Sequence, residues 1–139
     1  MVETRAAAAL PQDVRDFLAT PRYAVVATIN ADGSPHQAVV WYLLDGDTLI
    51  LNSRVGRRWP SNALRDPRVS ITVEDGLDYA VVSGMLEAFG DPESAQGQIV
   101  EMGLRYEGPA GVARRGPVWR AQERVSFRLV PRRAEMRRG

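Results

Sequence analysis

Residues 52–68 have the sequence NSRVGRRWPSNALRDPR, and the rest of the chain can be organised around this stretch. The apolar run before it, Thr48 to Leu51, predicts a β-strand, and the apolar run after it, Val69 to Val73, predicts another. Between them, Ser61 to Arg65 predicts a short helical segment, which ends at Asp66-Pro67 because the residue before a proline disfavours helix. The stretch is therefore a strand that leads through a polar turn into a helix.

The polar turn in this stretch has the composition of an anion-binding site. It brings together Ser53, Arg54, Arg57 and Arg58, and Asn62 follows in the helical segment. Arginine binds phosphate oxygens through a planar fork of donors, and a helix N-terminus adds free N–H groups and a favourable dipole. The alternative is a solvated surface, because the chain contains no lysine and any positive cluster must consist of arginine.

Length and composition favour one soluble domain. The chain has 139 residues, a usual size for a single domain, and 45% of them are hydrophobic. We expect one domain over residues 1–139, with a core at about 11–131 and an exposed basic tail at 132–139. The chain has no cysteine, which excludes disulfides, and its N-terminal alanine run is too short for a signal peptide. A cytoplasmic protein is the expectation.

The charge and hydropathy of the chain argue against nucleic-acid and membrane partners. The net charge of +1 gives no general attraction to nucleic acid or to an anionic membrane. The basic tail at 132–139 lacks the interleaved aromatic residues on which bases stack. No apolar run approaches the roughly 20 residues that a membrane-spanning helix needs. We therefore expect a small-molecule partner.

The N-terminal half predicts one helix and three strands. Pro11 to Ala19 has the spacing of a short amphipathic helix. Tyr23 to Asn30 and Pro35 to Leu44 are β-rich runs joined by the turn sequence ADGS at 31–34, which predicts a hairpin. Thr48 to Asn52 is the third predicted strand.

The C-terminal half predicts three more strands around a helix and a loop. Gly84 within the fifth strand indicates a bulge or a close backbone approach. The predicted elements are a fourth strand at 69–75, a fifth at 79–89, a weak helix at 91–105, a glycine- and proline-rich loop at 107–117 and a last strand at 124–130. Six strands joined mostly by tight turns favour a mainly β, antiparallel barrel with short helices.

The chain is poor in the side chains that carry acid–base or metal chemistry. His36 is the only histidine, and no nucleophile-elbow glycines or phosphate-binding glycine loop are present. If the protein is an enzyme, its reactivity comes from a cofactor. Trp41 lies an odd number of residues from His36 on the predicted strand, so the two point to opposite faces. Trp41 is either core or the border of an aromatic cofactor, while Trp59 and Trp119 fit core, subunit interface or ligand wall.

Three segments together resemble the pyridoxamine 5′-phosphate oxidase-like split-barrel family. They are ATINADGSPHQAVVWYLLDGDTLILNS at 27–53, GRRWPSNALRDPRVSITV at 56–73 and YAVVSGMLEAFGDPE at 79–93. The resemblance implies a six-stranded antiparallel split β-barrel that works as a homodimer. It also implies a cofactor, FMN or the deazaflavin F420, in a groove that both subunits line.

The resemblance assigns roles to individual positions. Ser53, Arg54, Arg57 and Arg58 would hold the cofactor phosphate, and Asn62 would support their loop from the short helix. The ring of the cofactor would lie along Val39, Val40 and Trp41. Trp59 stands where many relatives carry a phosphate-binding lysine, so if it faces the groove, Arg57 and Arg58 must bind the anion.

The form of the RRWPSN turn is more similar to the F420-dependent reductases of this family than to its vitamin-salvage oxidases. The resemblance thus implies an oxidoreductase that transfers a hydride between F420 and an organic substrate in the dimer groove. His36, Tyr42 or water would supply a proton. An FMN-dependent oxidoreductase or flavin reductase of the same fold, and a protein that only binds its cofactor, are the alternatives.

Overall fold

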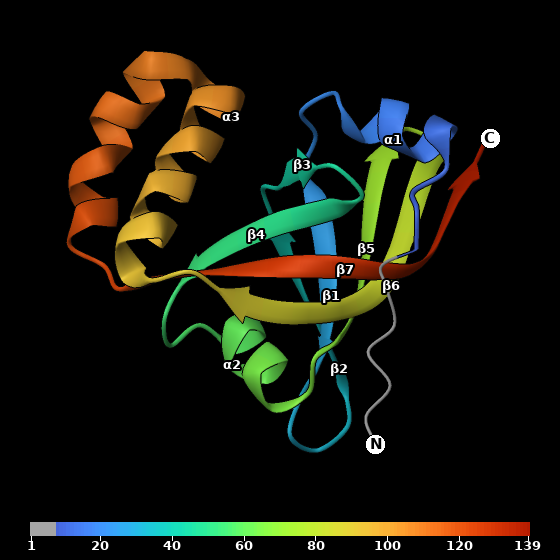
Figure 1. Ribbon diagram of the computed structural model, residues 1–139, viewed down its shortest axis with the longest axis horizontal. Coiled ribbons are helices and arrows are strands. Elements are labelled where there is room, and N and C mark those ends of the chain that lie inside the picture. The colour runs from blue at the N-terminus through green and yellow to red at the C-terminus, as the bar shows by residue number, and fades with distance from the viewer. Residues whose placement is uncertain (1–7) are drawn as a thin grey trace.

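The computed structural model describes residues 8–139 as a strongly curved antiparallel sheet with three helices (Figure 1). The first seven residues, on which part of the signal-peptide expectation rests, lie outside the described range. The elements are α1 (Gln12–Leu18), β1 (Ala24–Ile29), β2 (Pro35–Val40), β3 (Leu43–Asp45), β4 (Thr48–Arg54), α2 (Arg58–Arg65), β5 (Arg68–Asp75), β6 (Asp78–Phe89), α3 (Pro92–Arg120) and β7 (Arg124–Arg137). The prediction of a mainly β, antiparallel split barrel with short helices is confirmed.

The sheet has seven strands, in the order β2-β1-β5-β6-β7-β4-β3, where six were predicted. The predicted strand at 35–44 is divided at Trp41 and Tyr42, so that β2 pairs with β1 and β3 pairs with β4. These two strands are the opposite edges of the sheet. Three residue steps cover at most about 11 Å, so the chain between Val40 and Leu43 brings the two edges together and closes the barrel.

Tyr42 accounts for the break in the predicted strand. Its side chain is fully buried, and its hydroxyl donates hydrogen bonds toward the carbonyl oxygens of Leu18 (2.9 Å) and Thr20 (3.1 Å). Its backbone N–H donates to the hydroxyl of Tyr106 (3.2 Å) instead of to a neighbouring strand. Burial raises the pKa of the Tyr42 hydroxyl, so the group stays a neutral donor.

The glycine- and proline-rich segment at 107–117 was predicted to be a loop, and that prediction is wrong. It belongs to α3, which begins with a capping box between Asp91 and Ser94 and breaks at Gly108, where φ is 74°. Pro109 suits the first turn of a helix, because its missing N–H would be unpaired there in any case. Helix therefore resumes after the break, and the two arms of α3 lie side by side (Figure 1).

Two other boundaries differ from the predictions. α2 begins at Arg58 and not at Ser61, since Pro60 is tolerated in a first helical turn. The last strand does not end at Val130: β7 continues to Arg137 and pairs with β6 as far as Tyr79. The basic tail expected at 132–139 is thus largely a sheet strand, and its arginines are carried on a paired backbone.

The bulge predicted at Gly84 is confirmed. The register between β6 and β7 shifts between Ser83 and Gly84, and Gly84 stands opposite Pro131. A Cβ atom at Gly84 would overlap the carbonyl oxygen of Val130. The absence of a side chain is therefore what lets the two backbones approach.

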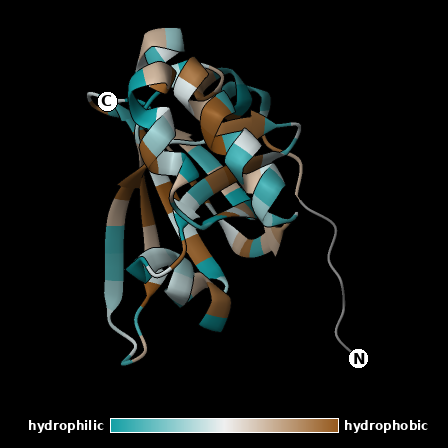
Figure 2. Cartoon of the chain, turned by 90° about the vertical axis from the view of Figure 1, so that its left-hand side faces the viewer, coloured by the Kyte–Doolittle hydropathy of each residue, from teal (hydrophilic) through white to brown (hydrophobic). Residues whose placement is uncertain are grey.

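The described residues form two packed clusters. The main core fills the barrel, and α1 and α2 contribute to it through residues such as Leu18 and Trp59. A smaller cluster of Leu43, Ile50, Ile99, Met102 and Trp119 joins α3 to the β3–β4 edge. Buried and more exposed residues alternate along β1 and β5, as expected when one face of a strand packs on a core, and both hydrophobic and hydrophilic residues lie along the strands in Figure 2.

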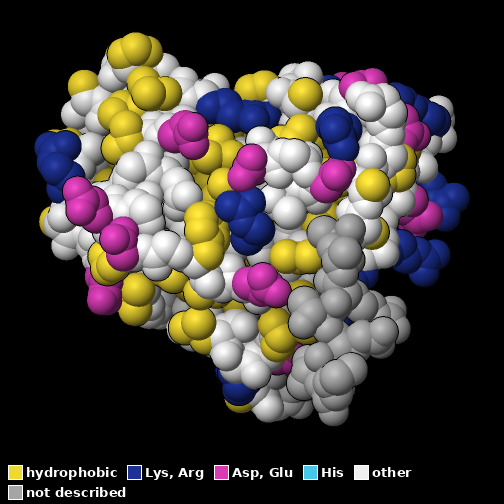
Figure 3. Space-filling model, in the orientation of Figure 1, with side chains coloured by type: hydrophobic (Ala, Val, Ile, Leu, Met, Phe, Trp, Pro, Cys, Tyr) yellow, Lys and Arg dark blue, Asp and Glu magenta, His cyan; other side chains and the backbone are white. Residues whose placement is uncertain are grey.

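The surface carries charges of both signs. Arginine and acidic side chains are interspersed over the face in Figure 3, in keeping with the small net charge. No helix among residues 8–139 is long and apolar enough to cross a membrane.

Gly84→Ala should destabilise the protein, because the new methyl group meets rigid backbone at Val130. We expect a loss of about 1–3 kcal/mol in the free energy of unfolding. Gly97→Ala is the matched control: Gly97 lies exposed in α3 with open space around it, so this change should stabilise by about 0.5–1 kcal/mol. Chemical denaturation of both variants checks the prediction, and equal effects would contradict it.

Candidate functional site

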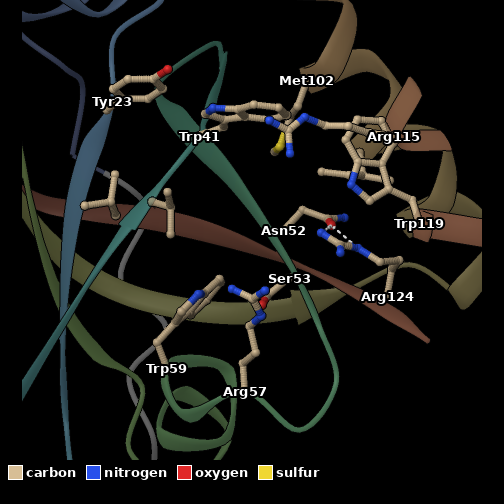
Figure 4. Close-up of a pocket in the computed structure, with 13 residues that line it drawn as sticks. Tyr23, Trp41, Asn52, Ser53, Arg57, Trp59, Met102, Arg115, Trp119 and Arg124 are labelled. Carbon is tan, nitrogen blue, oxygen red and sulfur yellow. Dashed lines mark hydrogen bonds between the residues drawn. The ribbon is translucent and has the colours of Figure 1, made fainter. Parts of the chain in front are cut away.

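A cavity of about 320 Å³ lies between the barrel and α3 (Figure 4). Its basic and polar lining consists of Asn52, Ser53, Arg57, Arg115 and Arg124. Its apolar and aromatic lining consists of Tyr23, Val39, Val40, Trp41, Trp59, Ile99, Met102 and Trp119. The size is at the lower end of the range for small-molecule sites.

Six of the nine residues predicted to bind a cofactor line this cavity. They are Val39, Val40, Trp41, Ser53, Arg57 and Trp59. Arg58 and Asn62 instead line a separate surface hollow with Arg65, beside the β1–β2 turn. Arg54 lines neither, although it stands opposite Arg124 in the pairing of β4 with β7. The roles of all nine remain predictions.

Asn62 ties α2 to β1 and does not reach the cavity. Its amide donates to the hydroxyl of Thr28 (3.2 Å) and to the side-chain oxygen of Asn30 (3.0 Å). It therefore fixes the helix that follows the arginine turn, which is an indirect form of the predicted support.

Trp59 is mostly core: it is buried and packs on the ring of Phe127, with 5.5 Å between ring centroids.

Arg124 was not predicted, and it is the most firmly held cation in the cavity. Its Nε and Nη2 donate to Oδ1 of Asn52 (3.0 and 2.8 Å), and its Nη1 donates to Oε1 of Gln122 (2.6 Å). Asn52 is itself buried, and its amide nitrogen donates to the carbonyl of Ala95 and the hydroxyl of Ser126, both at 2.9 Å. A guanidinium has five N–H donors, so Arg124 keeps unused donors for a ligand.

The positive charges of Arg57 and Arg124 in the cavity have no counter-ion in the described chain. No carboxylate of residues 8–139 lies within ion-pair distance of Arg57 or Arg124, whose partners are neutral. Burial and, to a smaller extent, the charges of Arg57 and Arg54 lower the pKa of Arg124 to about 10. A bound anion would favour the charged form of Arg124 and so oppose the effects of burial and of the neighbouring charges on its pKa. The buried hydroxyl of Ser53 lies beside the Arg57 side chain (Figure 4).

The aromatic side of the cavity is built around Trp41. Its ring stacks on Tyr106, with centroids 5.0 Å apart and planes 9° apart, and meets the edge of Trp119 at 6.2 Å. The Tyr106 hydroxyl donates to the carbonyl of Arg22 (2.7 Å) and accepts from Tyr42 N–H. Burial raises the pKa of Tyr106, which keeps this hydroxyl neutral. Tyr106 thus holds Trp41 in one orientation.

The two side chains considered as proton donors do not line the cavity. His36 lies on β2 opposite Thr28, and the Tyr42 hydroxyl is bonded to backbone carbonyls in the core. The lining contributed by residues 8–139 contains neither a histidine nor a carboxylate. Of the three predicted proton sources, water alone fits this lining.

The residues that were missed come from distant parts of the chain. Arg124 and Asn52 are 72 positions apart and meet through the pairing of β7 with β4. Arg115 lies in the segment predicted to be a loop, and Trp119, for which a ligand wall was one of the predicted roles, lies two residues beyond it; their spacing of four is that of one helix face. The four-residue spacing of Arg115 and Trp119 was the signal in the sequence that could have placed them on one helix face.

Known proteins share this fold. Residues 10–137 match the family described as pyridoxamine 5′-phosphate oxidase. A conserved hypothetical protein from Mycobacterium tuberculosis is 29% identical with a TM-score of 0.76, and 97% of this chain and 89% of that chain are covered. A protein named F420 reductase is 25% identical with a TM-score of 0.74, and 91% of this chain and 98% of that chain are covered.

A more distant structure shares the fold alone. It is an FAD-binding protein from Mesorhizobium loti, 20% identical with a TM-score of 0.66, with 95% of this chain and 97% of that chain covered. Comparison with curated protein sequences gives no match.

Tyr106→Phe should loosen the aromatic side of the cavity, because it leaves Arg22 C=O and Tyr42 N–H without their partner. We expect a loss of about 1–3 kcal/mol in unfolding free energy and a weaker near-ultraviolet circular dichroism signal from Trp41. Tyr23→Phe is the control, since Tyr23 stacks on the other face of Tyr106 and its hydroxyl bonds none of the described residues. Identical behaviour of the two variants would contradict the assigned role.

Proposed function

Because the chain belongs to the pyridoxamine 5′-phosphate oxidase family, we propose that it is an oxidoreductase that binds F420 in this cavity and reduces an organic substrate there. One observation carries the proposal: a cluster of Arg57, Arg124 and Ser53 without a carboxylate faces an aromatic wall in one cavity. A ligand with a phosphate ester and a planar ring matches both sides of the cavity, because the phosphate suits the arginines and the ring suits the aromatic wall.

The residues present fit such a cofactor. Arg57 and Arg124 offer charged donors to phosphate oxygens, and Ser53 offers a hydroxyl. Val39 and Trp41 offer an apolar surface to a ring, and Tyr106 holds that surface in place. The chain uses Asn52, and no acid, to anchor Arg124, so the positive charge stays available to an anion.

F420, when bound, supplies the hydride that the side chains of this protein cannot. The contribution of the chain is to orient the ring against the substrate, to exclude water through Trp41, Trp119 and Met102, and to grip the phosphate. A proton required by the product would come from solvent, because the described lining has no acid.

The choice of F420 rests on the pattern of similarity. The protein named F420 reductase is more similar to this chain than the FAD-binding protein is, at 25% identity against 20%. FMN also carries a phosphate ester linked to a similar ring, so binding of the phosphate alone does not discriminate between the two cofactors.

We also propose that a second copy of the chain completes the site. Tyr23 and Val39 line the cavity, yet 66% and 69% of their surfaces are exposed. Val39 lies on the edge strand β2, and Tyr23 directly precedes the neighbouring strand β1; apolar side chains and unpaired backbone at a sheet edge favour association. A homodimer would cover this apolar rim.

Titration of the purified protein with F420 and, separately, with FMN tests the function. Preference for F420, followed by loss of its absorbance with an acceptor substrate, is the expected result. Preference for FMN would transfer the protein to the flavin-dependent branch, and binding of neither would overturn the proposal. Light scattering of the same samples would test the dimer.

Arg57→Ala should weaken cofactor binding by roughly 10- to 100-fold, the value of one charged hydrogen bond. Arg58→Ala is the matched control, because Arg58 is the next residue but lines a different hollow. Fluorescence titration of both variants checks the prediction. Equal losses would mean that the predicted pair Arg57 and Arg58 acts together, against the geometry of the cavity.

Phosphate affinity should fall above pH 10, because Arg124 binds an anion only as a cation and its pKa is about 10. The affinity is complete below this pKa and is lost as pH rises through it, by about fourfold at pH 10.5. Inorganic phosphate is the probe, measured calorimetrically between about pH 8 and 10.5, where its own charge is constant. Arg124→Gln should bind it weakly with no step at this pH.

A further inference from the structure

The second arm of α3 brings an additional guanidinium into the cavity. Arg115 and Trp119 are one helical turn apart, so they project from the same face, and both line the cavity. In Figure 4 the Arg115 side chain reaches toward Trp41 and Met102, whereas Arg57 lies at the other end beside Ser53. In that view Trp41 and Trp119 flank Arg115, and Asn52 and Arg124 lie between the Arg115 end and the Arg57 end of the cavity (Figure 4).

Glu107 orients this guanidinium. Nε of Arg115 donates to Oε1 of Glu107 at 2.6 Å, and Nη2 donates to Oε2 at 3.1 Å. The pair joins the two arms of α3 across the break at Gly108, and Gly111 makes room for the Glu107 side chain. Because Nη1 bonds none of the described residues, its two N–H groups can meet a ligand.

The charge at this end stays positive in spite of the ion pair. Arg114 also lies near Glu107, with 3.8 Å between Nη2 and Oε2, so one carboxylate faces two guanidinium groups. Arg114 does not line the cavity, whereas Arg115 does. Glu107 bonds Arg115 more closely than Arg114 and offsets most of the Arg115 charge, so what Arg115 presents to the cavity is its two free N–H groups.

We propose that Arg115 is the substrate-recognition residue of this cavity and selects planar, apolar organic substrates that carry a carboxylate. The inference rests on the proposed function, in which the cofactor phosphate occupies the end at Arg57 and Arg124. The planar part of the substrate packs on Trp119, next to the cofactor ring on Trp41, and the carboxylate accepts hydrogen bonds from the free N–H groups of Arg115.

Cinnamate and cinnamamide test this proposal, because they share one planar skeleton and differ in charge. Each is titrated into the cofactor-loaded protein, with binding followed by calorimetry. We expect the wild type to bind cinnamate about 5- to 10-fold more tightly, a factor limited by the half-exposed setting of Arg115. Arg115→Met should abolish this preference, and Arg115→Gln, which keeps a donor for Glu107, should abolish it as well.

Arg114→Met is the matched control, since it removes a neighbouring charge near Glu107 outside the cavity and should leave the preference intact. Equal affinity of the wild type for both compounds would overturn the proposal, as would loss of the preference in Arg114→Met. A fall in cofactor affinity in Arg115→Met as large as that in Arg57→Ala would place Arg115 in the cofactor grip, which also overturns it.

Failure of the proposed function has a different signature. In that case the wild type binds neither F420 nor FMN, and cinnamate and cinnamamide are then compared on the cofactor-free protein. If the cofactor-free protein prefers cinnamate and loses this preference in Arg115→Met, the recognition role of Arg115 is supported independently of the cofactor. If the cofactor-free protein shows no such preference, the role is overturned.

Discussion

The hydrogen bonds of Tyr42 are the constraint on which the rest of the structure depends. This buried side chain lies in the two-residue connection between β2 and β3, the opposite edges of the sheet. Its hydroxyl is tied to the end of α1, and its backbone N–H is tied to Tyr106 of α3. One residue thus joins the barrel closure to both helices. The same connection carries Trp41, so closure of the barrel also sets the aromatic wall of the cavity.

The partners of two arginines explain why they suit different tasks. Arg124 is anchored by the neutral amide of Asn52, and its charge is therefore uncompensated and attracts an anion into the interior. Arg115 is anchored by the carboxylate of Glu107, which fixes its orientation but offsets most of its charge. Burial lowers the pKa of Arg124, whereas Glu107 raises that of Arg115. The first arrangement suits strong binding of a phosphate, and the second suits selection among substrates.

The sequence predicted what is encoded locally. Turn residues located the β1–β2 hairpin, where Gly33 takes a positive φ, and Gly84 located the bulge, where no Cβ fits against the backbone of Val130. Side chains that meet through strand register could not be found this way: Arg124 reaches Asn52 only because β7 lies beside β4. The loop prediction for 107–117 was wrong because Gly-Pro pairs usually end a helix. Here Gly108 ends the first arm of α3 and Pro109 begins the second.

The candidate site lies between two packed clusters of different character. The residues proposed to bind the cofactor phosphate lie on β4, on β7 and at the start of α2, and sheet pairing such as Ser53 with Val125 fixes their geometry. The residues proposed to meet the substrate stand on α3, which packs on the sheet edge through a smaller, separate cluster. Substitutions on the second arm of α3 can therefore alter the substrate end without disturbing the barrel. The architecture separates the groups that would hold a common cofactor from those that would choose what it reduces.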